Sequence, residues 1–348
     1  MMRWVLAAGV LMVLLAACGG NDDRPGGAVT PGVTSGQPGP GVLIVANLDA
    51  LVEYDIESGN QSTLLQSPAT NSFLLDPAVS PDGASIAYVQ QPPPKVEEGK
   101  FDAGSDLWVM ARDGSNPRLV FQHVQPNQLV RFPRFEGPES ILAIVQEIST
   151  QDGITRVVYT LQRIEVATGE RESVMEDVLA FDISSDGQRL VVARLLPQTG
   201  EALHASALDG GGSTELVGAE QLLAPFSYPR FSPDGRTVAF ASADQTGARA
   251  AVQLVSLVRG SGGRFEPTAA PAAVLDGLPQ DIWTVDATGG QAVRVADLKE
   301  DLPALTWDGA GEHLYVIGVA GLYDVDLRSG AVARLGEGAF HAQLAWSP

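Results

Sequence analysis

The chain has 348 residues, of which 42 are acidic and 22 are basic, so its formal net charge is −20. A content of 45% hydrophobic and 18% charged residues excludes a wholly disordered chain, and the length suffices for one large or two ordinary domains. The acidic balance argues against nucleic acid or an anionic lipid surface as partner, and a lone cysteine excludes an intramolecular disulfide or a thiolate zinc cluster.

Residues 1–17 have the pattern of a signal peptide. Arg3 precedes an apolar run over residues 5–15, which is too short to span a bilayer but has the length of a signal-peptide core. The run ends in Leu15-Ala16-Ala17-Cys18, which resembles the lipobox of bacterial lipoproteins. That resemblance implies that Cys18 is lipidated and anchors the mature chain to a membrane, whereas the alternative is an ordinary secretory peptide in which Cys18 has no role.

Residues 18–41 are predicted to be a lipid anchor and a flexible tether. Glycine and proline dominate this segment, and no apolar period is present. Such a composition holds a folded body away from the membrane. We therefore expect an extracytoplasmic, lipid-anchored protein of the cell envelope.

The rest of the chain contains an internal repeat. A Ser-x-Asp-Gly segment follows an apolar residue and precedes a short alternating run at three places: Ser80-Pro81-Asp82-Gly83, Ser184-Ser185-Asp186-Gly187 and Ser232-Pro233-Asp234-Gly235. Two weaker copies share the spacing, with Glu136-Gly137-Pro138-Glu139 and Asp308-Gly309-Ala310-Gly311 as their turns. The pattern predicts a strand, a tight turn and a second strand.

A second pair of strands is expected in every repeat, with an outer turn marked by a glycine. Six such glycines occur, at Gly59, Gly114, Gly169, Gly210, Gly289 and Gly330. Units of about forty residues with four short strands each are typical of a β-propeller. We therefore predict an all-β fold over residues 42–348, a six-bladed β-propeller of four-stranded blades.

The two ends of the repeat region predict how the ring closes. Residues 42–66 supply only three strands of a unit, at 42–46, 51–55 and 61–65. The missing innermost strand is found at residues 342–348. The C-terminal strand should therefore complete the first blade and pair with its first strand.

These repeats resemble those of TolB-like six-bladed propellers, on the Ser-Pro-Asp-Gly turn, the strand after it, a Leu-Trp or Ile-Trp strand and an Asp-Gly or Thr-Gly turn. The resemblance covers residues 42–348 and implies the fold. The same repeat also occurs in periplasmic scaffold proteins, peptidase propellers and a few polysaccharide lyases. TolB-like proteins carry a further N-terminal α/β domain, and residues 19–41 are too few to supply one.

The longest connections should all lie on one face of the propeller. They fall between the second and third strands of a blade, at residues 90–105, 146–156 and 242–280. Connections from second to third strand and from blade to blade emerge on one face, which we call the insertion face. The other face, which carries the tight turns within blades, is called the turn face. Loops on a rigid scaffold are common binding sites, so the insertion face is the predicted partner surface.

Four side chains are candidates for binding a partner. Arg134 and Arg230 each follow a proline and are expected at the start of an innermost strand, near the channel mouth on the insertion face. His123 and Arg131 are expected in a blade-to-blade loop on that face. An arginine there can grip a carboxylate with two hydrogen bonds, and the alternative is a structural ion pair with one of the 42 acids.

The sequence contains no catalytic motif. It lacks the Gly-x-Ser-x-Gly elbow of hydrolases, the glycine-rich phosphate loops and a calcium loop, and its four histidines are dispersed. We expect no cofactor, no metal and no catalytic residue. The predicted function is a non-enzymatic scaffold for an envelope protein or peptide, with two alternatives: a polysaccharide-binding or polysaccharide-active propeller with its site in the central channel, and a sensor or accessory subunit of an envelope complex.

Overall fold

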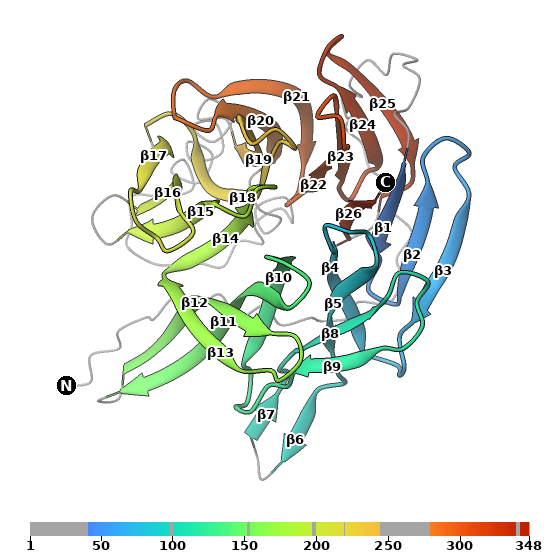
Figure 1. The fold of residues 1–348 in the computed structure, drawn as a ribbon, viewed down its shortest axis with the longest axis vertical. Coiled ribbons are helices and arrows are strands. Elements are labelled where there is room, and N and C mark those ends of the chain that lie inside the picture. Colours follow the sequence, from blue (N-terminus) through green and yellow to red (C-terminus); the bar gives the residue numbers. More distant parts are fainter. Residues whose placement is uncertain are drawn as a thin grey trace, which may run out of the picture.

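The computed structural model describes residues 41–97, 100–151, 154–196, 200–218, 220–243, 279–338 and 342–347. Every regular element in these ranges is a β-strand, and six four-stranded sheets surround a central axis (Figure 1). The predicted all-β, six-bladed propeller is confirmed. The predicted signal peptide, Cys18 and nearly all of the tether lie outside the described residues.

Each blade is a meander whose first strand lies next to the axis. From the axis outward, blade 1 contains β26 (Gln343–Ser347), β1 (Val42–Ala46), β2 (Ala50–Asp55) and β3 (Gln61–Gln66), and blade 2 contains β4 (Phe73–Val79), β5 (Ser85–Gln91), β8 (Asp106–Ala111) and β9 (Arg118–Phe121). Blade 3 contains β10 (Leu129–Phe135), β11 (Ser140–Gln151), β12 (Ile154–Glu165) and β13 (Arg171–Glu176).

Blades 4 to 6 repeat the arrangement. Blade 4 contains β14 (Val178–Ile183), β15 (Arg189–Leu196), β16 (Gly200–Ala207) and β17 (Thr214–Val217), and blade 5 contains β18 (Leu223–Phe231), β19 (Thr237–Ala243), β20 (Gln280–Asp286) and β21 (Val293–Glu300). Blade 6 contains β22 (Ala304–Trp307), β23 (His313–Ile317), β24 (Leu322–Asp326) and β25 (Ala331–Gly336).

The ring closes through the C-terminal strand, as the sequence predicted. β26 pairs antiparallel with β1, so that Val42 lies opposite Ser347 and Ala46 opposite Gln343. Both chain ends of the propeller thereby lie in one blade. Because Val42 stands at the turn-face end of β1, the preceding chain leaves the propeller on the turn face.

The repeated serine and aspartate close the tight turns. In blade 2 the Ser80 hydroxyl donates to Asp82 (2.6 Å) and accepts from the backbone N–H of Ser85 (2.9 Å). The turns of blades 4 and 5 have the same contacts. In blade 6, Asp308 takes over, because its Oδ1 accepts the N–H groups of Glu312 (2.8 Å) and His313 (3.0 Å). This exchange explains why that copy of the repeat is weak.

The outer turns are also confirmed. The six predicted glycines all adopt a positive φ, between 69° and 97°. Side chains disfavour that conformation, so glycine fixes where the third strand turns into the fourth.

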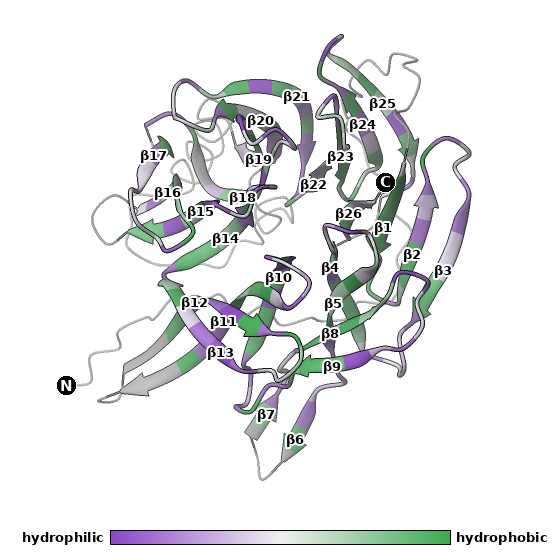
Figure 2. Cartoon of the chain, in the orientation of Figure 1, coloured by the Kyte–Doolittle hydropathy of each residue, from purple (hydrophilic) through white to green (hydrophobic). Residues whose placement is uncertain are grey.

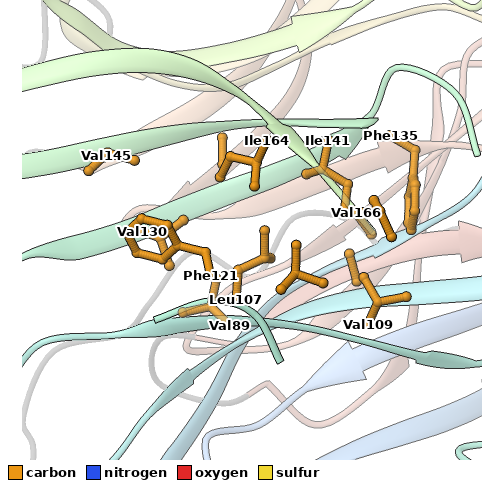
Figure 3. Packing of buried hydrophobic residues seen from close by; sticks show 14 of the residues in the cluster. Val89, Leu107, Val109, Phe121, Val130, Phe135, Ile141, Val145, Ile164 and Val166 are labelled. Atoms are coloured by element: carbon orange, nitrogen blue, oxygen red, sulfur yellow. The ribbon is translucent and has the colours of Figure 1, made fainter. Parts of the chain in front are cut away.

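The core is divided among the contacts between neighbouring blades. Six clusters of buried apolar residues each join two adjacent blades. Figure 3 shows the cluster between blades 2 and 3, where Val89 and Leu107 of blade 2 face Val130 and Ile164 of blade 3. Figure 2 shows hydrophobic residues along β1 and β14 and hydrophilic residues over much of the outer strand β13. The buried clusters hold the blades in fixed positions.

The predicted insertions take different forms. Residues 90–105 contain a two-stranded hairpin, β6 (Lys95–Glu97) and β7 (Lys100–Asp102). Of residues 146–156, those at 146–151 and 154–156 are not a loop but the continuation of β11 and β12, which are 12 residues long each. Of residues 242–280, the segment 244–278 lies outside the described part of the chain.

Candidate functional site

The innermost strands of blades 2, 3 and 5 share a backbone bulge. Asp76, Phe132 and Tyr228 each precede a proline and have φ values of 47°, 53° and 48°. The strand register shifts at each of these positions. A positive φ is uncommon for residues other than glycine and often occurs at functional or tightly constrained sites. The bulge allows each strand to continue through a proline.

Two of the bulged residues meet across the axis. The rings of Phe132 and Tyr228 pack edge to face with centroids 5.5 Å apart, although blade 4 separates their blades. Tyr228 also hydrogen-bonds the side chain of Gln343 from blade 1. Burial raises the pKa of Tyr228 to about 12. Side chains from three blades therefore cross the central channel at this level.

Arg131 lies in the innermost strand β10, and its predicted position in a loop is wrong. Its Nε donates to Asp76 Oδ2 (2.7 Å), which also accepts the backbone N–H of Phe132 (3.1 Å). The guanidinium carbon lies 4.8 Å from the centroid of the Phe132 ring. β10 begins at Leu129, two residues before Arg131, because pairing with β11 extends to that position.

Arg134 and Arg230 are the next-to-last residues of β10 and β18, so their predicted position at the strand starts is also wrong. The prolines before them lie within the strands because of the bulges. Arg134 Nε donates to Asp182 Oδ1 (3.1 Å), and Arg230 Nη1 donates to the carbonyl of Pro229 (2.8 Å). Both arginines lie nearer the turn face than expected and contact neighbouring residues of the propeller.

Asp182 links three blades near the axis. The carboxylate belongs to β14 of blade 4 and accepts from Arg134 of blade 3 and from the backbone N–H of Phe231 of blade 5 (2.9 Å). Burial raises the pKa of Asp182 to about 6, although the charge of Arg134 and the hydrogen bond from Phe231 act in the opposite direction. The axial arginines are thus engaged in structural contacts, and a role in binding a partner remains a prediction.

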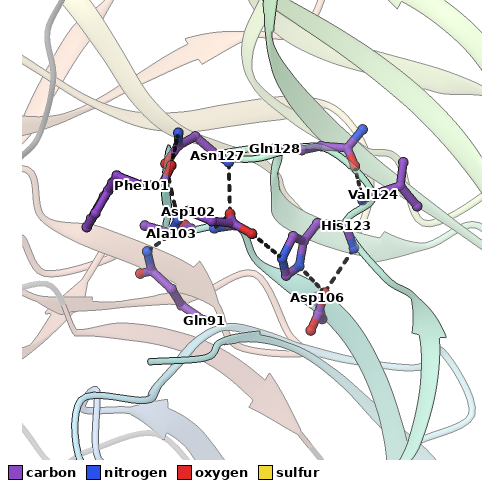
Figure 4. A network of polar contacts seen from close by, with 10 residues as sticks. Gln91, Phe101, Asp102, Ala103, Asp106, His123, Val124, Asn127 and Gln128 are labelled. Carbon is purple, nitrogen blue, oxygen red and sulfur yellow. Dashed lines mark hydrogen bonds and ion pairs between the residues drawn. The ribbon is translucent and has the colours of Figure 1, made fainter. Parts of the chain in front are cut away.

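His123 lies in the loop between β9 and β10, as predicted, but its side chain is only 15% exposed. Its Nδ1 lies 2.6 Å from Asp106 Oδ1, and its Nε2 lies 3.4 Å from Asp102 Oδ2 (Figure 4). Asp106 belongs to blade 2 and Asp102 to the hairpin. Gly104 leaves room for the imidazole, because a Cβ there would lie 2.3 Å from the His123 ring. His123 therefore joins the hairpin to the blade.

Asn127 makes a second connection to the hairpin. Its side-chain amide donates to the carbonyl of Phe101 (3.0 Å) and accepts from the N–H of Ala103 (3.1 Å). Its own backbone N–H donates to Asp102 (3.0 Å). The pKa of the Asp102 carboxyl is lowered overall. Burial alone would raise it, but the hydrogen bonds from Asn127 and Gly104 and the nearby His123 outweigh that effect.

Exposed apolar side chains gather on the insertion face. Ten large apolar side chains are exposed in the described ranges, and eight of them lie on connections of that face or on the strand ends that lead to them: Val96, Phe101, Val124, Ile148, Val157, Leu195, Leu302 and Val319. The other two, Leu119 and Val293, lie on outer strands. Val96 is 71% exposed and Phe101 is 55% exposed. These eight side chains are spread over several blades, and their placement on one face favours that face as an interaction surface.

The turn face has a different chemistry. Its exposed carboxylates form local hydrogen bonds, as Asp55 does with the hydroxyl of Ser58 (2.6 Å) and Asp326 with that of Ser329 (2.7 Å). Those hydroxyl bonds, joined by backbone N–H groups, lower the pKa of both carboxyls. The turn face is therefore acidic and largely satisfied by its own contacts.

The sequence analysis did not find the aspartates that pair with His123, Arg131 and Arg134. Asp76, Asp102, Asp106 and Asp182 were not singled out, although each lies in or beside a strand that should bury its apolar neighbours. An acidic residue inside an apolar strand, such as Asp182 in Val-Leu-Ala-Phe-Asp-Ile, is the signal that could have found one of them. Buried acids require partners.

The described residues offer few other candidate sites. A depression of about 430 Å³ lies between the outer strands of blades 3 and 4, lined by Arg163, Glu172 and Leu208 among others.

In the part of the chain that the structure describes, no three His, Cys, Asp or Glu side chains are grouped so as to hold a metal. The same ranges contain no helix of the length and hydropathy needed to cross a membrane.

No known protein family matches the sequence, and no curated protein matches it. Among solved structures, the chain is similar to TolB from Acinetobacter baumannii, with 12% identity, a TM-score of 0.53, and coverage of 88% of this chain and 66% of that one. It is also similar to a putative TolB from Agrobacterium tumefaciens, with 14% identity, a TM-score of 0.55, and coverage of 90% and 100%.

A third similar structure is hydrazine synthase from Kuenenia stuttgartiensis, with 12% identity, a TM-score of 0.57, and coverage of 89% of this chain and 47% of that one. At such identities these similarities concern the fold alone. The expected resemblance to TolB-like six-bladed propellers is confirmed at the level of the fold. The chain spans about two thirds of the Acinetobacter protein and less than half of hydrazine synthase.

Proposed function

We propose that the protein is a non-enzymatic propeller that binds a protein or peptide partner in the cell envelope through its insertion face. The observation that carries this proposal is the gathering of eight exposed apolar side chains on that face. Protein interfaces bury aromatic and apolar groups of this kind at their centre. The turn face offers mainly carboxylates with local hydrogen bonds, which have less to gain from a partner.

The attachment of the hairpin to blade 2 and to the loop after it supports the same proposal. His123 and Asn127 fasten the hairpin that presents Val96 and Phe101. A surface that is fixed before binding loses less conformational entropy when the partner arrives. His123 contributes here by positioning the hairpin, since its own side chain is mostly buried.

The central channel has less support as the binding site. The side chains of Phe132, Tyr228 and Gln343 meet at the axis, and Arg131 and Arg134 are paired with buried aspartates. A glycan-binding channel would need polar groups that are free to accept or donate hydrogen bonds. We therefore favour a protein or peptide over a polysaccharide as ligand.

The envelope location and the membrane anchor rest on the N-terminal sequence. Residues 1–17 and Cys18 have the lipoprotein pattern, and two of the similar structures are named TolB or putative TolB. The chain before Val42 leaves on the turn face. A tether of 23 residues attached there leaves the insertion face accessible on the side away from its attachment.

The test is affinity capture from the native envelope with two sets of substitutions. The triple variant V96S/F101S/V124S changes the insertion face, and the control L119S/V293S changes two equally apolar positions on outer strands. All five side chains are exposed, so both variants should fold normally. The parent and the control should retain the same protein partner, and the triple variant should recover at least tenfold less of it.

Equal recovery by the triple variant would contradict the insertion face as the binding surface. Retention of envelope glycans without any protein would favour the channel and the polysaccharide alternative. Capture is read by mass spectrometry for proteins and by sugar analysis for glycans, so the two outcomes are distinguished in one preparation.

A further inference from the structure

The hairpin of β6 and β7 has one edge covered and one edge open. The two strands pair antiparallel, with Lys95 opposite Asp102, Val96 opposite Phe101 and Glu97 opposite Lys100. Asn127 covers the outer edge of β7, because its side chain bonds the carbonyl of Phe101 and the N–H of Ala103 (Figure 4). These contacts determine which way the backbone groups of β6 point.

In an antiparallel pair, residues directly opposite each other alternate between exchanging two backbone hydrogen bonds and exchanging none. The carbonyl of Phe101 is directed to Asn127 and hence away from β6. Phe101 and Val96 therefore form a pair without mutual backbone bonds. The N–H and C=O of Val96 point outward from the open edge, where they have no hydrogen-bond partner among the described residues.

The open edge is complementary to itself. If two copies of β6 pair antiparallel around a two-fold axis through Val96, the Val96 N–H of each copy donates to the Val96 carbonyl of the other. The same register places residue 95 of one copy opposite residue 97 of the other. The sequence thereby sets a lysine opposite a glutamate twice, which favours the pairing, since opposite charges directly across a sheet attract.

We propose that the β6 edge is a docking site for a second copy of this chain. The resulting sheet has the order β7, β6, β6 and β7, and the exposed side chains of Val96 and Phe101 from both copies lie on one of its faces. The proposal goes beyond the proposed function, because it concerns association of the protein with itself and needs no other partner.

The pairing is short, and its strength should be modest. Pro94 precedes β6 and has no N–H to donate, so the ladder is limited to about three residues on each copy. A pair of this size needs a high local concentration, which a common membrane anchor would supply. The experiment must therefore detect a weak complex.

The test is disulfide trapping in the full chain with Cys18→Ser, so that an introduced cysteine stands alone. It is run at high protein concentration, which replaces the membrane anchor that this substitution removes. The V96C variant places its two thiols across the two-fold axis, where the Cα atoms of a bonded pair lie about 5.5 Å apart, within reach of a disulfide. V124C is the matched control, because Val124 is 72% exposed and Val96 is 71% exposed. Under mild oxidation, V96C should form dimers at least tenfold faster than V124C.

Charge reversal tests the register. In the V96C background, K95E and E97K should each slow dimer formation at least fivefold, because like charges then face each other. An equimolar mixture of the two variants should form heterodimers at the parental rate, since it restores both opposite-charge pairs. Equal rates for V96C and V124C, or a mixture that dimerises no faster than the two variants separately, would overturn the proposal.

Discussion

Asp182 has the most consequential environment of any single residue near the axis. The Asp182 side chain is 11% exposed, and its carboxylate binds groups from the blades on both sides. A buried acid of this kind is costly to ionise even beside an arginine, because both charges have left water. The contacts of Asp182 therefore join three blades, but its ionisation at neutral pH lowers the stability of the folded protein.

The first prediction concerns how the ionisation of Asp182 makes the free energy of unfolding depend on pH. The pKa of Asp182 is about 6 in the folded protein and about 3.9 in the unfolded chain. Because the folded value is the higher one, its contribution to stability is fully present below pH 3.9 and is lost as the pH rises through 6. Relative to D182N, the parent should lose about 1–3 kcal/mol of unfolding free energy between pH 4 and pH 7. Urea unfolding of both proteins at four pH values measures this difference, and parallel curves would disprove the assignment.

The second prediction concerns His123. The H123A variant removes the connection that runs from Asp106 of blade 2 through the imidazole to Asp102 of the hairpin, so the amides of β6 and β7 should exchange hydrogen at least tenfold faster while the other blades keep their protection. H313A is the matched control, because His313 forms a similar bond to Asp324 (2.8 Å) in blade 6. Hydrogen exchange read by mass spectrometry checks this, and unchanged exchange in the hairpin of H123A would refute the positioning role.

At the scale of elements, the closing strand is the feature on which the ring depends. β26 supplies the innermost position of blade 1, and Leu344 contributes to the cluster between blades 6 and 1. Without β26 the first blade loses its contact with the axis and β1 becomes an unpaired edge.

Deleting residues 341–348 should therefore open the ring and cost on the order of 5 kcal/mol or more, which is comparable to the whole stability of a domain. A control that replaces residues 95–102 with two glycines also alters eight residues but leaves all six blades intact. Circular dichroism during heating should show a large fall in Tm for the deletion alone. Similar melting of the deletion and the parent would contradict the role of β26.

The elements that the sequence predicts well are those with local signals. The bounds of β1 and the six outer-turn glycines follow from alternation and turn chemistry within about ten residues. The hairpin of β6 and β7 has no such signal, because its strands are three residues long and follow three prolines. The bulges at Phe132 and Tyr228 were missed since a proline usually begins or ends a strand.

The candidate site was less predictable for a different reason. Which of the 42 acids pairs with an arginine depends on ring closure, since Asp76 and Arg131 are 55 residues apart and Arg134 and Asp182 are 48 apart. Sequence reasoning could name the structural ion pair as an alternative but could not name the partner. The insertion face, in contrast, was predictable, because it follows from the order of strands and the lengths of their connections.

At the scale of the whole molecule, the propeller has two chemically different faces and an axis that side chains from three blades cross. Exposed apolar side chains lie on the insertion face, and carboxylates with local bonds lie on the turn face from which the N-terminal chain leaves. A partner that gains free energy by burying apolar surface would bind the first of these faces. This distribution is the central claim of the proposed function.

Site-specific photo-crosslinking in living cells tests that claim most directly. A photoreactive amino acid is placed at position 101 or 124 on the insertion face, at 115 on the turn face, or at 293 on an outer strand, all of which are exposed. The account predicts a common protein adduct from positions 101 and 124 and none from 115 or 293. An adduct formed mainly from position 115, or the absence of any adduct from the insertion face, would contradict it.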